Sequence, residues 1–461
     1  MRNGSEMTTR RRFMVTAGTA LLGLGSAARA QNTPPSLADL RGSLDAVELG
    51  MRPGGIDDQS RELNAILERA SEQRSPVFLP PGTYMVSNLN LPRYVHLTGI
   101  AGATRLVYGG DGHFVLAENA EHIRLSELTF DGANRWLADY VQATLQVTGV
   151  VKIDIEGCRF LGSRRHAISL DGSGGSITRS RISGAADAAI YCVEGLGMRI
   201  ADNEIADCAN GGILVHRWRA AADGSIISGN RVARIGARSG GTGQNGNGIN
   251  AYRADKVLIA DNVLEGCAFS AIRCNSSSDV QLVGNRCSDS GETAIYCEFA
   301  FQGAVVANNL VDGAANGVSI SNFNEGGRLA AVTGNVIRNL KTEGPYPQEG
   351  FGFGWGIGVE ADTAVTGNVI DSAPRAGMLL GWGPYLRSVA ATGNVVRNSA
   401  VGVAVSVAEG AQSAQISNNI FQNTLRGAVI GYRWADPATE DLAKAGADGF
   451  SHLDIFGNTV L

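Results

Sequence analysis

Ser228-Gly229-Asn230-Arg231-Val232 is one copy of a five-residue phrase that recurs along most of the chain. The phrase places a small or acidic residue before Asn and an apolar residue two positions after it. Further copies are Ala201-Asp202-Asn203-Glu204-Ile205, Ala260-Asp261-Asn262-Val263-Leu264 and Val283-Gly284-Asn285-Arg286-Cys287, later copies centre on Asn309, Asn335, Asn368, Asn394, Asn419 and Asn458, and Cys158 and Ser180 hold the same place in two earlier copies. Successive centres lie 22 to 39 residues apart, and a period in this range predicts a solenoid.

Each repeat has a second half, in which a small residue precedes alternating apolar positions. Examples are Ala189-Ile190-Tyr191-Cys192, Gly212-Ile213-Leu214-Val215, Ala294-Ile295-Tyr296-Cys297 and Gly317-Val318-Ser319-Ile320. Alternation with a period of two is typical of strands. Helical repeats need apolar residues at three- and four-residue spacing and tolerate few Gly, whereas this chain has 61 Gly. The sequence therefore predicts an all-β fold, a right-handed parallel β-helix of the pectin-lyase-like type.

The repeated Asn has a structural interpretation. A sharp bend between two strands needs a residue that tolerates left-handed backbone angles, and Asn tolerates them best after Gly. We therefore expect the Asn residues to occupy these bends. Stacked coils would also let the side-chain amides bond to one another along the column. The column is accordingly predicted to be structural and not catalytic.

The N-terminus predicts export. Thr9-Arg10-Arg11-Arg12-Phe13-Met14 precedes a mostly apolar run over residues 15–28, and Ala28-Arg29-Ala30 forms an A-x-A cleavage pattern. This pattern indicates a twin-arginine (Tat) signal peptide over residues 1–30, cut after Ala30. An ordinary secretory signal with a chance Arg cluster is the alternative. We expect the Tat translocon as a partner during export and a periplasmic or secreted mature protein.

Charge and hydropathy limit the other partners. The formal net charge is −5, and removal of residues 1–30, which carry five Arg and one Glu, leaves −9. An acidic protein binds nucleic acid poorly, so no nucleic acid is expected as a partner. Since no other apolar stretch approaches the roughly 20 residues that cross a bilayer, no membrane span is expected in the mature protein.

The segment after the signal resembles a known architecture. Asp57-Asp58-Gln59-Ser60 precedes an amphipathic run over residues 61–70, and then follow Pro76-Val77-Phe78-Leu79-Pro80-Pro81-Gly82-Thr83-Tyr84 and Val95-His96-Leu97-Thr98-Gly99. These stretches resemble the opening of pectate-lyase-superfamily β-helices, in which a short helix caps the solenoid. With its twin-arginine signal, the chain resembles a family of twin-arginine-translocated β-helix repeat proteins whose activity is unassigned.

The resemblance implies a domain organisation but no chemistry. After the signal, residues 31–461 should form one β-helix domain, with an N-terminal segment and cap helix over residues 31–75 and coils over residues 76–461. The sequence has no Asp-Pro-His-Glu of mannuronan epimerases and no Asp-Asp, His-Gly and Arg-Ile-Lys set of polygalacturonases. It also has no clustered calcium-binding acids of pectate lyases. A shared fold does not carry over an activity.

All seven Cys lie between Cys158 and Cys297, without a C-x-x-C pair or zinc-like spacing. Cys192, Cys274 and Cys297 fall on the same inward strand position, where Cys packs as a small hydrophobe. Disulfides between neighbouring coils remain open in an oxidising compartment. No cofactor and no metal are expected. Ca²⁺ is left open as an alternative, although no motif indicates it.

Strand alternation defines two outward columns of side chains. If the Ile residues of each repeat point inward, the first column is Tyr191, Leu214, Asn250, Arg273, Tyr296 and Ser319, and the second is Asp171, Val193, His216, Tyr252, Asn275, Glu298, Ser321 and Glu360. Coils about 4.8 Å apart would bring His216, Tyr252, Asn275 and Glu298 within roughly 15 Å of one another, the scale of an oligosaccharide. We predict a groove between residues 191 and 298. A merely solvated polar face is the alternative.

Basic and aromatic residues refine the prediction. Arg217, Arg219, Arg231, Arg234, Arg238, Arg253, Lys256 and Arg273 form a positive stripe, which favours an anionic, uronate-containing polysaccharide or oligosaccharide unless these residues pair with acids on adjacent coils. Trp218, Trp382, Tyr385 and Trp434 follow predicted strands directly, and an insertion over residues 339–355 carries Tyr346, Phe351, Phe353 and Trp355. Such aromatics either stack on sugar rings or anchor the loops that hold them.

Three functions remain open. In a lyase, His216 or Tyr252 would remove the proton next to a uronate carboxylate that Arg273 neutralises. In an inverting glycoside hydrolase, Glu298 and Glu360 would lie about 9.6 Å apart. The third is a non-catalytic glycan- or partner-binding scaffold. The predicted catalytic residues are His216, Tyr252, Arg273 and Glu298, and the predicted substrate-binding residues are Tyr191, Arg217, Trp218, Asn250, Arg253, Asn275, Tyr296, Glu360 and Trp382.

The predicted C-terminal strand over residues 455–461 has no obvious covering helix, unless the insertion over residues 436–447 is helical and folds over it. An uncovered strand edge invites pairing with another chain. Homo-oligomerisation therefore stays open.

Overall fold

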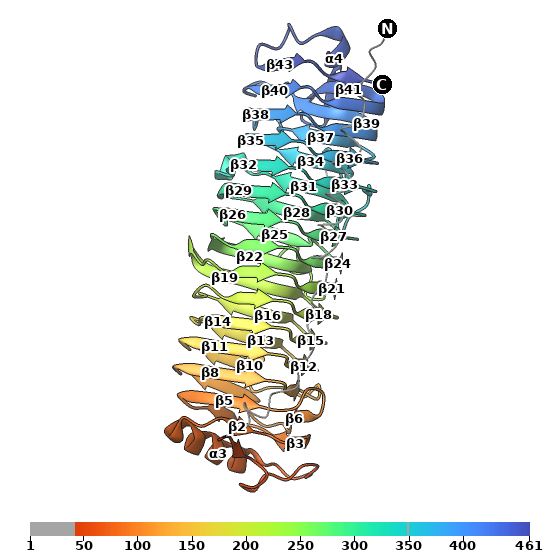
Figure 1. The fold of residues 1–461 in the computed structure, drawn as a ribbon. Helices are drawn as coiled ribbons and strands as arrows, with labels where there is room; N and C mark the ends of the chain where they lie inside the picture. The colour runs from red at the N-terminus through yellow and green to blue at the C-terminus, as the bar shows by residue number, and fades with distance from the viewer. Residues whose placement is uncertain (1–41, 348–349) are drawn as a thin grey trace, which may run out of the picture. The chain divides into compact units, whose positions relative to one another are not determined.

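The computed structural model describes residues 42–347 and 350–461. The expected signal peptide, residues 1–30, and the first part of the N-terminal segment lie outside the described residues. From Gly42 onward the chain forms a single unit. It is a solenoid of parallel strands in which most coils carry three short strands, and most strands pair with the strand three places later in the chain (Figure 1).

The three strands of a coil belong to three ladders, which we call sheets I, II and III in chain order. Sheet I contains β4 (Leu89–Leu91), β7 (Val115–Glu118), β10 (Ala143–Thr148), β13 (His166–Asp171), β16 (Ala188–Val193), β19 (Gly211–Ala222), β22 (Asn247–Asp255), β25 (Ile272–Asn275), β28 (Thr293–Glu298), β31 (Asn316–Ile320), β34 (Trp355–Val359) and β37 (Ala376–Leu380). Sheet II contains β1 (Leu44–Asp45), β2 (Val77–Phe78), β5 (Tyr94–Thr98), β8 (His122–Ser126), β11 (Lys152–Glu156), β14 (Gly175–Thr178), β17 (Arg199–Ala201), β20 (Ile226–Ser228), β23 (Leu258–Ala260), β26 (Val280–Val283), β29 (Gln302–Ala307), β32 (Arg328–Thr333), β35 (Ala361–Thr366), β38 (Arg387–Thr392), β40 (Ala414–Ser417) and β43 (Leu453–Phe456).

Sheet III contains β3 (Gly82–Val86), β6 (Thr104–Tyr108), β9 (Thr129–Asp131), β12 (Arg159–Leu161), β15 (Arg181–Ser183), β18 (Glu204–Ala206), β21 (Arg231–Ile235), β24 (Val263–Cys267), β27 (Arg286–Ser288), β30 (Leu310–Asp312), β33 (Val336–Arg338), β36 (Val369–Asp371) and β44 (Thr459–Val460). Two long strands, β39 (Val395–Ser406) and β41 (Ile420–Arg433), turn the corner from sheet III into sheet I of the next coil.

The core is a stack of apolar side chains inside the coils. In sheet I, Ile190 pairs with Ile213, which pairs with Ile249, and the column continues through Ile272 and Ile295. All five are 0% exposed. The predicted alternation, with these positions inward and their neighbours outward, is confirmed. The same interior holds all seven Cys, each buried and with a free thiol.

The Asn column forms the predicted ladder, but the predicted bend position was wrong. Asn309 Nδ2 donates to the side-chain oxygen of Asn335 (2.9 Å) and to the carbonyl of Leu282 (2.9 Å). The left-handed backbone angle falls on the residue before each Asn, for example Asn308 with φ 57° and Gly334 with φ 66°. The residue before each Asn therefore forms the bend between two strands. This bend directs the buried Asn amide along the solenoid axis.

The two ends are built differently. The predicted cap helix is present as α3 (Ser60–Gln73), which buries Leu63, Ile66, Leu67 and Ala70 against the first coils. The helical prediction for residues 436–447 was largely wrong. β42 (Asp436–Asp441) pairs antiparallel with β41, and only α4 (Leu442–Ala445) is helical, with the Asp441 side chain accepting from the backbone of Ala443. A single 3₁₀ turn, η1 (Phe323–Glu325), follows β31.

Within residues 42–347 and 350–461, no helix is both long and apolar enough to cross a membrane.

Candidate functional site

The two predicted outward columns exist on the outer face of sheet I. Strand register places Tyr191, Leu214, Asn250, Arg273, Tyr296 and Ser319 in one column, and Val193, His216, Tyr252, Asn275 and Glu298 in the other. The first column continues as Gly358, Leu379, Ala404 and Ile430. We call this surface the site face. Its character changes along the solenoid, from aromatic and His residues through a buried ion-pair network to an apolar pocket.

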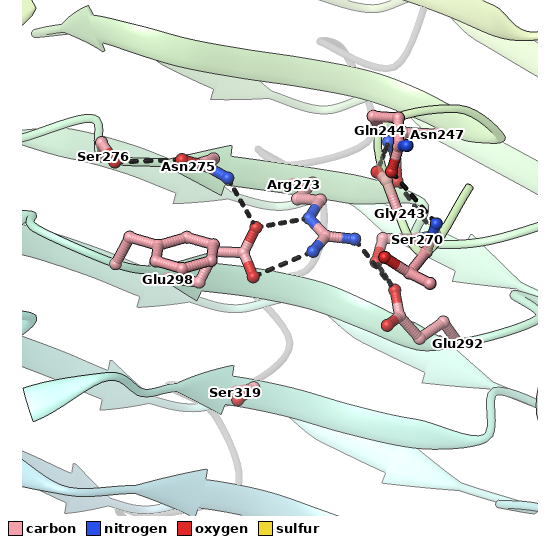
Figure 2. A network of polar contacts seen from close by, with 12 residues as sticks. Gly243, Gln244, Asn247, Ser270, Arg273, Asn275, Ser276, Glu292, Glu298 and Ser319 are labelled. Carbon is pink, nitrogen blue, oxygen red and sulfur yellow. Dashed lines mark hydrogen bonds and ion pairs between the residues drawn. The ribbon is translucent and has the colours of Figure 1, made fainter. Parts of the chain in front are cut away.

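The ion-pair network is centred on Arg273, which lies between two carboxylates (Figure 2). Its guanidinium binds Glu298 in a bidentate manner, at 2.6 Å from Nε and 2.9 Å from Nη2, and contacts Glu292 at 3.2 Å from Nη1. Asn275 donates a further hydrogen bond of 2.9 Å to Glu298. Since the side chains of Arg273, Glu292 and Glu298 are 10%, 2% and 3% exposed, this is a desolvated network.

Neighbouring loops cover this network. The insertion places the Tyr346 hydroxyl 2.5 Å from Glu292, and Ser270 donates to the same carboxylate. Gly243 lies directly against the guanidinium, so that any side chain there would overlap it. Burial raises the pKa of Glu292 above its usual range. Because the charge of Arg273 is already matched by two buried acids, Arg273 is not free to neutralise a substrate carboxylate.

Other parts of the predicted positive stripe are neutralised in the same way. Arg217 contacts Glu194 at 2.7 Å and the fully buried Asp223 at 3.6 Å. Arg234 binds Asp207 at 2.7 Å. Glu194 and Asp207 lie on adjacent coils, as in the alternative interpretation of the stripe.

An aromatic and imidazole ladder occupies the N-terminal part of the site face. The rings of His166 and Tyr191 stack at 4.7 Å, Tyr191 meets His216 edge-on at 5.4 Å, and His216 meets Tyr252 at 5.6 Å. The guanidinium of Arg253 lies 4.8 Å from the Tyr252 ring. This ladder unites the predicted residues Tyr191, His216, Tyr252 and Arg253.

His216 is a neutral group at physiological pH. Burial, reinforced by the nearby His166, lowers the pKa of His216 to about 4. Within the described part of the chain, its Nε2 and the Asn250 Oδ1 are buried without a hydrogen-bond partner. The neutral imidazole is in the protonation state that a base requires, although so low a pKa makes the base weak.

Trp218 lies on a bulge beside this ladder. The register between β19 and β22 shifts after His216, and the inserted residues carry Trp218 outward, where it is 65% exposed. Its backbone is held by the Glu194 carboxylate at 2.7 Å and by Arg253 at 2.7 Å. Bulges of this kind re-aim a side chain, and this one displays an aromatic ring next to the site face.

A cavity lies further toward the C-terminus than the predicted groove. It has a volume of about 300 Å³. Its lining residues come from β28, β31, β34 and β37, from the loops that follow them and from the insertion: Tyr296, Ser319, Ser321, Asn322, Phe351, Gly352, Trp355, Gly358, Val359, Glu360, Leu379, Gly381 and Trp382. Of the predicted site residues, Tyr296, Glu360 and Trp382 meet here, and we call this cavity the Glu360 pocket.

Glu360 is the titratable acid of the pocket lining. Its carboxylate accepts a 2.6 Å hydrogen bond from the backbone N–H of Phe323. Burial among apolar and aromatic groups outweighs this bond and raises the pKa of Glu360 to about 7. The carboxyl group is therefore partly protonated near neutral pH and is suited to acid–base chemistry.

Sequence analysis missed the pocket because its walls come from the insertion. The stretch Gly350-Phe351-Gly352-Phe353-Gly354-Trp355-Gly356 alternates Gly with aromatic residues, a signal that marks close packing of rings on backbone. Phe351 and Trp355 line the pocket, whereas Tyr346 and Phe353 pack on each other at 5.6 Å and anchor the loop.

The Glu360 titration gives a measurable change in stability. The folded-state pKa, about 7, lies above the ordinary value of 4.5, so the stabilising contribution is fully present below pH 4.5 and is lost as pH rises through 7. Glu360→Gln keeps an acceptor for Phe323 but does not ionise. Relative to this variant, the wild-type free energy of unfolding should fall by up to about 3 kcal/mol between acid and alkaline pH. Urea unfolding across pH measures it, and the exposed Glu409→Gln should leave the wild-type profile unchanged.

Two known protein families match this chain. Residues 113–243 and 222–389 match the family described as the right-handed β-helix region, which covers more than half of the chain. The chain belongs to the right-handed β-helix family. Residues 44–136 of this β-helix protein also match the rhamnogalacturonase A/epimerase, pectate lyase-like family. The prediction of a right-handed, pectin-lyase-like β-helix is thereby confirmed.

Solved structures show the same architecture at low sequence identity. The pre-mature gene product 12 of bacteriophage phi29 has a TM-score of 0.51 at 16% identity, over 84% of this chain and 55% of the phage chain. Its N-terminal fragment has a TM-score of 0.50 at 16% identity, over 97% and 74%. The catalytic unit of a GH87 alpha-1,3-glucanase from Streptomyces thermodiastaticus has a TM-score of 0.44 at 14% identity, over 91% and 69%.

This β-helix protein thus spans about half of the pre-mature phage protein. At these identities the likeness is one of fold alone. A comparison with curated proteins finds no match.

Proposed function

We propose that this protein binds a polysaccharide on the site face, holds one sugar ring in the Glu360 pocket and hydrolyses the adjoining glycosidic bond with Glu360 as general acid. The observation that carries the proposal is a carboxyl group with a pKa of about 7 inside an aromatic-lined pocket. The match of residues 44–136 to a rhamnogalacturonase A/epimerase, pectate lyase-like family supports a carbohydrate substrate.

The pocket lining suits a sugar ring. Tyr296, Trp355 and Trp382 supply aromatic surface, and Ser319, Ser321 and Asn322 supply hydrogen-bond donors and acceptors. Ligand sites commonly combine apolar walls with a few convergent polar groups, and this division matches the apolar faces and hydroxyl edges of a pyranose.

A second carboxylate, that of Glu298, lies on the N-terminal side of Glu360. It accepts hydrogen bonds from Arg273 and Asn275, whereas burial raises the pKa of Glu360 to about 7. Glu298 follows Cys297, and Glu360 follows Val359, the equivalent position two coils later, so that paired-strand spacing separates the two backbones by about 9.6 Å. Because the Glu298 side chain is 3% exposed and bound by Arg273, Glu298 is not free to activate water, and Glu360 alone is proposed to act, as the general acid.

The charge distribution favours a neutral sugar over a uronate in the pocket. The described lining residues include Glu360 and no Lys, Arg or His. Arg273, the cation that the lyase mechanism requires, is committed to Glu292 and Glu298. Hydrolysis therefore has more support than β-elimination. The twin-arginine signal expected over residues 1–30 is consistent with a substrate outside the cytoplasm.

A polysaccharide screen tests the proposal. The purified protein is incubated with α-1,3-glucan, galactan, pectate and alginate, and three quantities are measured: binding by calorimetry, new reducing ends, and absorbance of unsaturated uronates. We expect binding and new reducing ends with a neutral glycan. Absorbance at the unsaturated-uronate band would instead establish a lyase, and binding without either product would establish a scaffold.

Trp382→Ala locates binding at the pocket. Loss of one aromatic wall should weaken the affinity about tenfold. Trp136→Ala is the matched control, since Trp136 is 70% exposed on the loop between β9 and β10 and does not line the pocket. Equal affinities of the two variants would contradict the placement.

A further inference from the structure

The described parts of the insertion between β33 and β34, residues 339–347 and 350–354, are together called the strap. The strap contacts coils on the N-terminal side of its own. Lys341 pairs with Asp289 at 3.1 Å, and Tyr346 donates to Glu292 at 2.5 Å. At its end, the backbone N–H of Gly354 donates to the Asn316 side chain at 3.0 Å. These contacts fasten the strap to coils that carry β28 and β31.

The later part of the strap reaches in the opposite direction, toward the C-terminal coils. Phe351 meets Tyr432 of β41 edge-on, with ring centroids 5.3 Å apart. Gly350 lies against Trp382, where an added Cβ would approach the indole to 2.9 Å. Arg375 holds this part of the strap through a 2.8 Å hydrogen bond to the Phe353 carbonyl. The strap therefore crosses the site face from one side to the other.

On the site face, several side chains under the strap and on the C-terminal coils after it are buried. Outward positions of a solenoid strand ordinarily face solvent, yet Ala376, Val401, Ala404 and Ile430 are between 0% and 5% exposed and form an apolar cluster with Trp355. In the column that contains Glu298 and Glu360, the later positions Ser406 and Tyr432 are 3% and 6% exposed. These positions therefore offer a sugar chain almost no accessible surface.

The opposite side of the pocket is polar. Ser321 and Asn322 are partly exposed, and on the N-terminal side of the buried Glu298 the column continues with Asn275 and Tyr252, which are also partly exposed. The pocket thus has a polar side toward the N-terminal coils and an aromatic wall of Phe351, Trp355 and Trp382 toward the C-terminal coils.

We infer that the Glu360 pocket is closed toward the C-terminal coils and holds the end of a polysaccharide chain, with the rest of the chain lying toward Asn275 and Tyr252. The inference rests on the proposed function and specifies its substrate as a chain terminus and not an internal segment. An enzyme of this design releases small products from one end, so that reducing ends accumulate well before the viscosity of the polymer falls.

End-blocked oligosaccharides test the inference. Linear gluco-oligosaccharides, galacto-oligosaccharides and oligogalacturonides are each prepared with free ends, with a methyl group on the non-reducing end, and with an aminobenzamide group on the reducing end. We expect the wild-type protein to lose at least tenfold in affinity for one blocked form and to retain affinity for the other. Equal affinity for all three forms would overturn the inference while leaving the proposed function intact. Absence of binding to every form would reject the proposed function and the inference together.

Removal of one ring from the aromatic wall of the Glu360 pocket gives an independent test. Phe351→Ala removes the ring that meets Tyr432 and should restore affinity for the blocked form that the wild type rejects. Leu425→Ala, at an 87% exposed position of β41, is the control and should keep the wild-type preference. Continued rejection by a folded Phe351→Ala protein, with its circular dichroism unchanged, would show that the ring is not the barrier.

Discussion

Glu360→Gln is expected to lower the rate of glycosidic cleavage by a factor of about 10²–10⁴, the usual contribution of a positioned general acid. The carboxyl group has a pKa of about 7 because it is buried in an aromatic pocket, so that it carries a transferable proton near neutral pH. Gln preserves the size and the acceptor for the Phe323 N–H but has no such proton. The measurement is the initial rate of new reducing ends on the best substrate of the screen.

The pH profile separates an acid from a merely structural residue. Because the protonated form is the active one, the wild-type rate should fall as pH rises through about 7, and the residual rate of Glu360→Gln should lack this decline. Glu409→Gln, at an exposed site, should keep both rate and profile. A Glu360→Gln rate within a few-fold of wild type would reject the acid role even if the glycan still binds.

Arg273→Ala is expected to destabilise the protein by about 3–5 kcal/mol, the cost of removing one partner from a buried ion pair. The substitution leaves Glu292 and Glu298 buried, close together and without their shared cation. Each carboxylate must then take up a proton or drag water into the site. Urea unfolding at neutral pH measures the loss.

Arg234→Ala is the matched control for this prediction. Its ion pair with Asp207 has a comparable distance of 2.7 Å, but the two side chains are 63% and 56% exposed, so the free energy of unfolding should change little. A triple variant, Arg273→Met with Glu292→Gln and Glu298→Gln, should recover part of the stability because no unpaired charge remains. Similar losses for Arg273→Ala and Arg234→Ala would mean that water reaches the network.

Much of the fold was predictable because each copy of the repeat determines the orientation of the strand residues next to it in the sequence. The position of Asn in each copy, such as Asn285 or Asn309, fixes which strand residues face inward, and the observed register of Tyr191, Arg273 and Tyr296 agrees with that count. The bend was assigned to the wrong residue because Asn and its neighbour both tolerate left-handed angles. Only the ladder of buried amides decides which of them turns the corner.

The site was less predictable because its chemistry depends on contacts between coils and with the strap. Arg273 was expected to be a free cation, but Glu292 lies 19 residues away in sequence and becomes its partner only through the end of a neighbouring loop. Glu360 was among the predicted site residues, but its raised pKa depends on burial in a pocket that the strap helps to wall. Alignment of repeats carries no information about an insertion that occurs once.

The Asn ladder has a consequence for how such a protein changes in evolution. Each coil accepts a hydrogen bond from the coil before it and donates one to the coil after it, as Asn309 does between Asn285 and Asn335. Coils are therefore interchangeable, because duplication or loss of one coil preserves the Asn–Asn hydrogen bonds between the coils that become neighbours. The strap limits this freedom, because its residues Tyr346 and Phe351 contact Glu292 and Tyr432 on different coils. We expect relatives to vary in coil number before β28 and to keep the count constant from β28 to β41.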